Sequence, residues 1–211
     1  MLASLLCVVA AYLLGCMSFA ILTSWLFRLP DPRTYGSGNP GATNVLRSGK
    51  RAAALVTLIG DAGKGWVAVM LASRIAPLLG FGAETVAACG VAVFLGHLYP
   101  MFFGFKGGKG VATAFGVLLG LSLWLALVAL GVFAVVLLVW RYVSLASVAA
   151  AIAAAVAAVM LFGWYAYAIA VIVLVVLIIW RHRANLQRLA AGTENKIAAA
   201  RSAIPPSGPA T

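Results

Sequence analysis

Two glycine-rich basic segments stand out in a chain that is otherwise strongly apolar. The first reads Gly-Ser-Gly-Asn-Pro-Gly at 36–41, and the second reads Phe-Lys-Gly-Gly-Lys-Gly at 105–110. Glycine lets a backbone approach an anion closely, and neighbouring N–H groups together with lysine can surround a phosphate. The two segments therefore predict a phosphate site, in either an enzyme or a transporter.

The first segment carries more hydrogen-bonding groups than a turn requires, namely Ser37, Asn39, Thr43, Asn44 and, three residues later, Arg47. Its glycine spacing matches G-x-G-x-x-G, but the dinucleotide-binding form of that motif follows a strand and opens a helix in a βαβ unit. Here it follows an apolar run and the link Leu-Pro-Asp-Pro. We therefore exclude a dinucleotide site, and a flexible surface turn remains the alternative.

The second segment lies between two apolar runs. A helix that starts near Val111 would direct the positive end of its dipole at an anion held by Lys106, Lys109 and the glycines between them. The spacing is not that of a Walker A loop. Alternatively, the two lysines only mark the end of a membrane span, and His97, just upstream, is expected to be structural rather than catalytic.

Two further places hold polar residues where apolar ones would be expected. Asp61 and Lys64 lie inside an apolar run and stand three residues apart, so they either pair with each other or face a polar cavity. Near the C-terminus, Arg181, Asn185 and Arg188 would share one face of a continuous helix, with His182 beside Asn185. That face either binds an anion or is a solvated basic end near lipid headgroups.

The composition places these segments in a membrane protein. Of the 211 residues, 64% are hydrophobic and 9% are charged, and the mean hydropathy is +1.09, which excludes an ordinary soluble domain. The net charge of +11 would suggest nucleic acid as the partner of a soluble protein. Because the basic residues gather at the ends of apolar runs, we interpret them as signals of membrane orientation and expect no nucleic-acid partner. The three cysteines lack metal-ligand spacing, so neither a metal nor a cofactor is expected.

Six apolar runs supply the expected spans, at 2–27, 52–73, 84–103, 111–140, 143–161 and 164–180. As one helix, 111–140 would be about 45 Å long, whereas the hydrocarbon core is about 30 Å thick. If all basic ends are cytoplasmic, this run turns back near Gly120–Ser122. The sequence then predicts an all-α bundle of seven transmembrane helices, with the N-terminus outside and the C-terminus cytoplasmic. A single crossing, which would put Arg141 outside, is the alternative.

Three motifs together closely resemble those of the bacterial membrane glycerol-3-phosphate acyltransferases that use acyl phosphate. They are Gly-Ser-Gly-Asn-Pro-Gly-Ala-Thr-Asn at 36–44, Gly-His-x-x-Pro-x-Phe-x-x-Phe-Lys-Gly-Gly-Lys-Gly-Val-Ala-Thr at 96–113, and His-Arg-x-Asn-x-x-Arg-Leu-x-x-Gly-x-Glu-x-Lys at 182–196. The resemblance spans residues 1–197, which we expect to form one transmembrane acyltransferase domain. Residues 198–211 are expected to be a disordered cytoplasmic tail.

The resemblance implies transfer of a fatty acyl group from acyl phosphate to the 1-hydroxyl of glycerol 3-phosphate. The products would be lysophosphatidic acid and inorganic phosphate, in phospholipid biosynthesis. It also implies a multi-pass monomer in the lipid of the bacterial inner membrane, with its active site on the cytoplasmic side. The runner-up, a transporter of a phosphate-bearing solute, would need polar residues along a path to the outer face. The spans 111–140 and 143–180 offer little beyond Ser122, Ser144 and Ser147.

The resemblance also implies roles for individual residues. The acyl-phosphate-binding set is Ser37, Gly38, Asn39, Gly41, Asn44, Lys106, Gly107, Gly108 and Lys109. The glycerol-3-phosphate-binding set is Arg47, Ser144, His182 and Asn185, and Glu194 is structural. Catalysis is assigned to Ser37, Arg47 and Lys106, which position the substrates and stabilise charge. Because acids are scarce and no His-x4-Asp dyad exists, no protein general base is expected.

Overall fold

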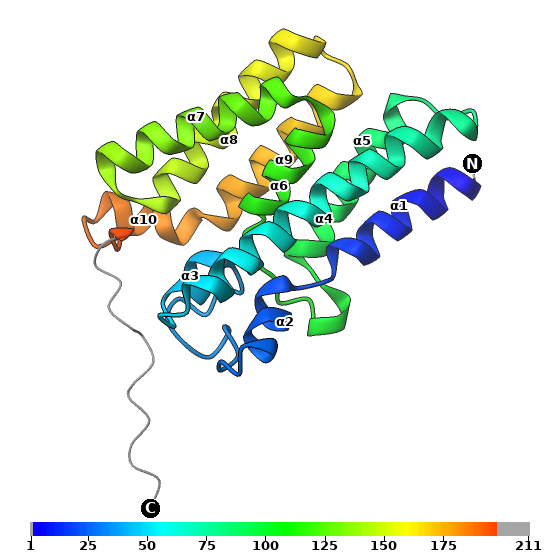
Figure 1. The fold of residues 1–211 in the computed structure, drawn as a ribbon. Helices are drawn as coiled ribbons and strands as arrows, with labels where there is room; N and C mark the ends of the chain where they lie inside the picture. Colours follow the sequence, from blue (N-terminus) through cyan, green and yellow to red (C-terminus); the bar gives the residue numbers. More distant parts are fainter. Residues whose placement is uncertain (1, 198–211) are drawn as a thin grey trace, which may run out of the picture.

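The computed structural model describes residues 2–197, and all the regular structure in that range is helical (Figure 1). In chain order the elements are α1 (Leu2–Gly15), α2 (Phe19–Leu26), α3 (Ala42–Leu46), α4 (Arg51–Leu78), α5 (Ala83–Leu98), the 3₁₀ turn η1 (Met101–Phe103), α6 (Val111–Leu121), α7 (Leu123–Trp140), α8 (Val143–Phe162), α9 (Ala166–Arg181) and α10 (Arg183–Ala190). The all-α fold class is confirmed. The predicted disordered tail lies outside the described residues.

The helices form a bundle with its long polar connections at one end (Figure 1). α4 runs through the middle and packs against α5 and α6, while α1 lies along α5 and α7 lies along α8. The short helices α2, α3 and α10 lie at the end that carries the motif segments. The short α4–α5 and α8–α9 turns lie at the opposite end. The fold therefore brings all three motifs to the same end of the bundle.

Long apolar helices make the bundle suited to a membrane. Within residues 2–197, four helical segments are long and apolar enough to cross it (51–78, 83–103, 123–140 and 143–162), and there are up to six such spans if each of two bent helix pairs is one span. The run 111–140 is broken at Ser122, where the backbone is extended, within the predicted turn region. α6, before this break, is only 11 residues long, or about 16 Å. The number of crossings and the sides of the termini stay predictions.

Two helices that we predicted to be continuous are broken. The first apolar run bends by 41° between α1 and α2, and the C-terminal helix bends by 56° between α9 and α10. The first break is stabilised because Lys64 Nζ donates to the carbonyl oxygens of Gly15 and Met17, at 3.0 and 2.7 Å. The second break, at His182, separates Arg181 from Asn185, so the prediction that they share one helical face is wrong.

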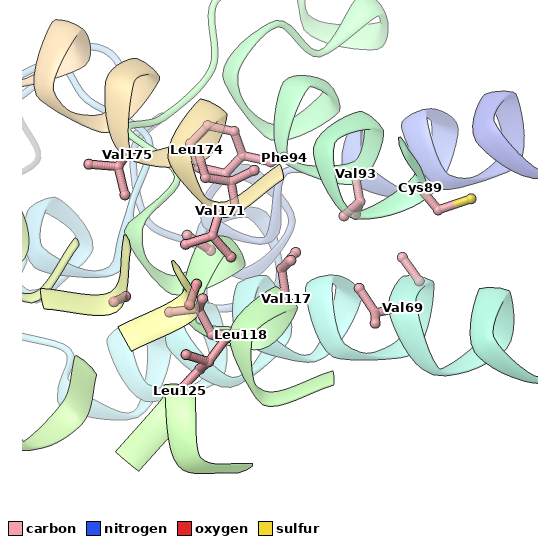
Figure 2. Packing of buried hydrophobic residues seen from close by; sticks show 14 of the residues in the cluster. Val69, Cys89, Val93, Phe94, Val117, Leu118, Leu125, Val171, Leu174 and Val175 are labelled. Atoms are coloured by element: carbon pink, nitrogen blue, oxygen red, sulfur yellow. The ribbon is translucent and has the colours of Figure 1, made fainter. Parts of the chain in front are cut away.

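The core is built largely from alanine, valine and leucine of the helices α4 to α9 (Figure 2). Small residues let the helices approach closely, which is how helices associate where lipid is as apolar as the core. The tightest example is the α4–α6 crossing. A methyl group at Gly65 would collide with the Thr113 carbonyl, and one at Gly116 would collide with the Ala62 carbonyl. This crossing fixes α6, and with it the segment that precedes α6.

Candidate active site

The first glycine-rich segment is folded around the side chain of Asn44, which is 2% exposed. Its Nδ2 donates to the carbonyl oxygens of Pro32 and Tyr35, at 2.6 and 3.1 Å, and its Oδ1 accepts from the amide of Ser37, at 2.9 Å. The amide of Asn44 is thus fully used inside the segment. Ser37 itself is exposed, with its side chain free to meet a ligand.

An ion pair connects the first segment to the second. The Arg33 guanidinium binds the Asp31 carboxylate at 2.6–3.1 Å, and its Nη1 donates to the carbonyl oxygen of Phe103 at 3.4 Å. Arg33 lowers the pKa of the Asp31 carboxyl through these hydrogen bonds. The pair remains charged at neutral pH and ties the start of the first segment to η1.

The second segment is anchored by its own backbone. The amides of Gly107 and Gly108 donate to the carbonyl oxygens of Leu98 and His97, both at 3.2 Å. Their carbonyl oxygens accept from the Arg181 guanidinium at 2.8–3.1 Å. A side chain at either glycine would collide with the end of α5. The glycines therefore permit a close packing contact, and in this structure their amides are engaged within the protein; their place in the donor site stays a prediction.

A polar network joins the second segment to the C-terminal motif. The Lys109 ammonium donates to Asn185 Oδ1, and Asn185 Nδ2 donates to Glu194 Oε1 at 2.6 Å. The same Glu194 oxygen accepts from the Ser144 hydroxyl at 2.7 Å, and Arg188 Nε donates to Glu194 Oε2 at 2.8 Å. Glu194 thus contacts two residues of the predicted acceptor site, and the structural role expected for it stays a prediction.

Burial and the charges of several neighbouring residues shift the pKa of Lys109. Burial is the main reason that the pKa of Lys109 falls to about 8, and Glu194 opposes this shift. The positive charges of Arg188, Arg181 and Arg47 lower the pKa further. Arg47 also lies against Gly36 in the first segment. The three motifs therefore create one strongly positive region.

His182 follows the last residue of α9 and is 3% exposed. Its Nδ1 lies 2.8 Å from the carbonyl oxygen of Ile178, which favours the neutral ring with the proton on Nδ1. Burial lowers the pKa of His182 to about 4. In this state Nε2 is a hydrogen-bond acceptor, so it can bind a phosphate only through a proton that the phosphate carries or that the ring takes up.

The structure brings Lys109, Ser144, Asn185 and Glu194 into direct hydrogen-bonded contact, and it places Arg47 close enough to affect Lys109. Ser37 and Lys106 are exposed at the same end of the bundle. Sequence reasoning considered Arg181 only as part of a basic helical face, and it missed that this residue holds the second segment. Its partners are backbone carbonyls 73 and 74 positions earlier, and no local pattern points to such contacts.

The chain is similar to known proteins over most of its length. A family model for glycerol-3-phosphate acyltransferase matches residues 5–192. A glycerol-3-phosphate acyltransferase of Nitrosospira multiformis is 55% identical over 190 residues, which cover 90% of this chain and 94% of that protein. One from Thiobacillus denitrificans is 52% identical over 193 residues, covering 92% and 96%.

Solved structures show the same similarity. The crystal structure of PlsY (YgiH), an integral membrane glycerol 3-phosphate acyltransferase, in its glycerol 3-phosphate form matches with a TM-score of 0.86 and 39% identity. The match covers 92% of this chain and 95% of that one. The lysophosphatidic acid form matches with a TM-score of 0.84.

The apolar helices and the likeness to an integral membrane protein together define a multi-pass helical membrane protein. Within that class, the chain belongs to the glycerol-3-phosphate acyltransferase family, because the family model and relatives above half identity span most of its length. The family expected from the three motifs is confirmed.

Proposed function

We propose that this protein transfers a fatty acyl group from acyl phosphate to the 1-hydroxyl of glycerol 3-phosphate, releasing lysophosphatidic acid and inorganic phosphate. Family membership and the glycerol 3-phosphate and lysophosphatidic acid forms of the similar crystal structures support the acceptor and the product. The proposal of acyl phosphate as donor rests on the chain's own residues.

The observation that carries this donor is the position of the four acidic residues, all of which lie within residues 2–197. Asp31 pairs with Arg33, and Asp61 pairs with Lys64. Glu194 accepts three hydrogen bonds from its neighbours. Glu84 lies in the first turn of α5, at the opposite end of the bundle. Three of these carboxylates are thus occupied by internal partners and the fourth lies far from the motifs, so a donor that brings its own base fits this arrangement.

The reaction then follows from positioning and charge. The glycerol hydroxyl oxygen attacks the acyl carbonyl carbon, the bond from that carbon to the phosphate oxygen breaks, and the leaving phosphate accepts the hydroxyl proton. Ser37 and Lys106 hold the acyl phosphate, with Lys109 beside them. Arg47, Ser144, His182 and Asn185 hold glycerol 3-phosphate. Fixed positive groups stabilise the negative charge that develops during attack. This stabilisation makes a large contribution to the rate of acyl transfer.

The site also fits a location at a membrane surface. The motif end of the bundle carries the basic residues that favour the cytoplasmic side. The long-chain donor and the product can remain in lipid beside the helices while their phosphates reach the polar loops. We therefore propose a monomeric enzyme of the bacterial inner membrane, formed by residues 1–197 as one domain, with the site facing the cytoplasm.

The test uses purified protein in lipid nanodiscs with glycerol 3-phosphate and either palmitoyl phosphate or palmitoyl-coenzyme A at matched concentrations. We expect lysophosphatidic acid and inorganic phosphate in equal amounts from palmitoyl phosphate. The thioester should react at least about tenfold more slowly. It lacks the acyl phosphate group, and losing roughly one charge-assisted contact to that group lowers the rate by about this factor. Comparable turnover with the two donors would overturn the proposal that the donor phosphate acts as the base.

A further inference from the structure

A buried charged cluster outside the proposed mechanism lies directly beneath the second glycine-rich segment. Asp61 and Lys64 on α4 and His97 on α5 are 2%, 3% and 7% exposed. Lys64 Nζ lies 2.9 Å from Asp61 Oδ1, which confirms the ion pair that the sequence left open. Burying such charges is costly, and apolar residues of similar volume would often stabilise a core as well. The cluster therefore calls for a role beyond stability.

His97 stands between this ion pair and the site. Its Nδ1 lies 3.4 Å from Asp61 Oδ1, and neither atom has a hydrogen-bond partner of good geometry within the described part of the chain. The carboxylate favours the tautomer with its proton on Nδ1. The opposite edge of the ring faces Gly108, where an added side chain would collide with His97 Nε2. Asp61 thereby sets which edge of the imidazole meets the glycine-rich segment.

The contact with Gly108 is also where the two glycine-rich segments meet. A side chain at Gly108 would lie 2.8 Å from the carbonyl oxygen of Pro40, which belongs to the first segment. The backbone of His97 accepts from the amide of Gly108 at 3.2 Å. His97 thus supports this junction through both its ring and its backbone, and Lys64 connects the same cluster to the break between α1 and α2.

We propose that His97, oriented by Asp61, is a positioning residue that fixes the junction of Gly108 with Pro40. The cluster acts through the loops and does not touch the reacting atoms. Which substrate it affects rests on the proposed function, because both loops are assigned to the acyl-phosphate site. The ordering of the junction itself is independent of that assignment.

The first measurement is hydrogen–deuterium exchange of peptides covering 104–111 in ligand-free protein in nanodiscs. In His97→Leu and Asp61→Asn, the amides of Gly107 and Gly108 should exchange about tenfold faster, since the junction loses its support. His97→Asn keeps a donor toward Asp61 and should lie nearer the wild type. Thr57→Val is the matched control, because it breaks a buried hydroxyl contact with Thr23 one turn earlier on α4. It should leave this exchange unchanged.

The second measurement is steady-state kinetics with the same variants. His97→Leu and Asp61→Asn should each lower kcat/KM for acyl phosphate about tenfold or more, while KM for glycerol 3-phosphate changes less than about threefold. If the two residues act as one unit, the double variant is no worse than the more damaged single variant. The double variant Asp61→Asn with Lys64→Met removes both charges. It replaces Asp61→Asn in both measurements if the unpaired Lys64 of that single variant prevents folding.

Wild-type exchange at 104–111 in His97→Leu and in the paired charge variant would overturn the proposal. Faster exchange that appears equally in Thr57→Val would overturn it too, since it would reflect general loss of stability. The exchange result does not depend on the donor. If the wild-type protein proved inactive with acyl phosphate, the proposed function would fail while the exchange experiment would still decide the role of His97.

Discussion

Lys109 and Asn185 are 76 positions apart in the sequence, yet the lysine ammonium donates a hydrogen bond to the asparagine side-chain oxygen. This contact joins the second glycine-rich segment to α10. Lys109 is assigned to the acyl donor and Asn185 to the acceptor, so the contact puts the two proposed phosphate sites side by side. Acyl transfer requires such proximity, because much of the rate enhancement comes from holding two reactants in attack geometry.

Asn185→Ala should impair the acceptor side of the reaction. Loss of one charge-assisted hydrogen bond costs about 1.5–3 kcal/mol, or roughly 10- to 150-fold, in KM for glycerol 3-phosphate or in turnover. KM for acyl phosphate should change little, whereas Lys106→Ala should act mainly on acyl phosphate. Steady-state constants for both substrates separate the two effects. Gln187→Ala, an exposed change on the same helix, is the control. A folded Asn185→Ala enzyme with normal kinetics would remove Asn185 from the acceptor site.

Phosphate binding should weaken above pH 8. Burial lowers the pKa of Lys109 to about 8, so its ammonium is present below that pH and is lost above it. KM for acyl phosphate should rise by up to about tenfold per pH unit above pH 8. The rise should stop at the pKa that Lys109 has in the complex, because above it the lysine is neutral with and without ligand. Lys109→Arg, which stays charged, should flatten the profile between pH 7.5 and 9.5. A flat wild-type profile over that range would show that the Lys109 charge does not contribute to binding.

His182 should not act as a general base near neutral pH. Burial lowers the pKa of His182 to about 4, so the neutral ring is only a weak base and its titration lies below the working range. The profile of kcat/KM for glycerol 3-phosphate should therefore show no step between about pH 5 and 7 that disappears in His182→Ala. A step near pH 6–7 that His182→Ala removes would identify His182 as the base.

Helix packing gives a stability prediction with an internal control. Gly116→Ala introduces a methyl group that collides with the Ala62 carbonyl of α4, and overpacking of this kind costs about 1–3 kcal/mol. Gly63→Ala lies on α4 with nothing within 4 Å of the added carbon. It should instead be neutral or stabilise by up to about 1 kcal/mol through helix propensity. Thermal unfolding in one detergent compares the two. Equal Tm values would contradict the close α4–α6 approach.

The membrane topology can be tested by cysteine labelling. After replacement of Cys7, Cys16 and Cys89, a cysteine at Ser122 should react with an impermeant maleimide added to intact cells. A cysteine at Arg141 should react only after permeabilisation, because α7 would return the chain to the cytoplasmic side. Labelling of the Arg141 cysteine in intact cells would rule out seven crossings.

Most of the helices follow from apolar runs alone, since few other structures satisfy backbone groups in lipid. The breaks after Gly15 and at His182 do not, and the first of them is stabilised by a tertiary contact that leaves no local pattern. The break after Gly15 depends on Lys64 of α4, and the segment after α5 depends on Arg181 of α9. The motifs also predicted the residues of the candidate site, while the pairing of Lys109 with Asn185 required the fold.

The complete hydrogen bonding of Gly107 and Gly108 has a thermodynamic consequence. Fixing the backbone of one residue costs about 1–2 kcal/mol in conformational entropy, and glycine loses more freedom than any other residue. Here that entropy is lost when the protein folds, before a ligand arrives. Substrate therefore meets a preorganised surface, and calorimetric titration of acyl phosphate should show a binding entropy free of the large unfavourable contribution that accompanies loop ordering.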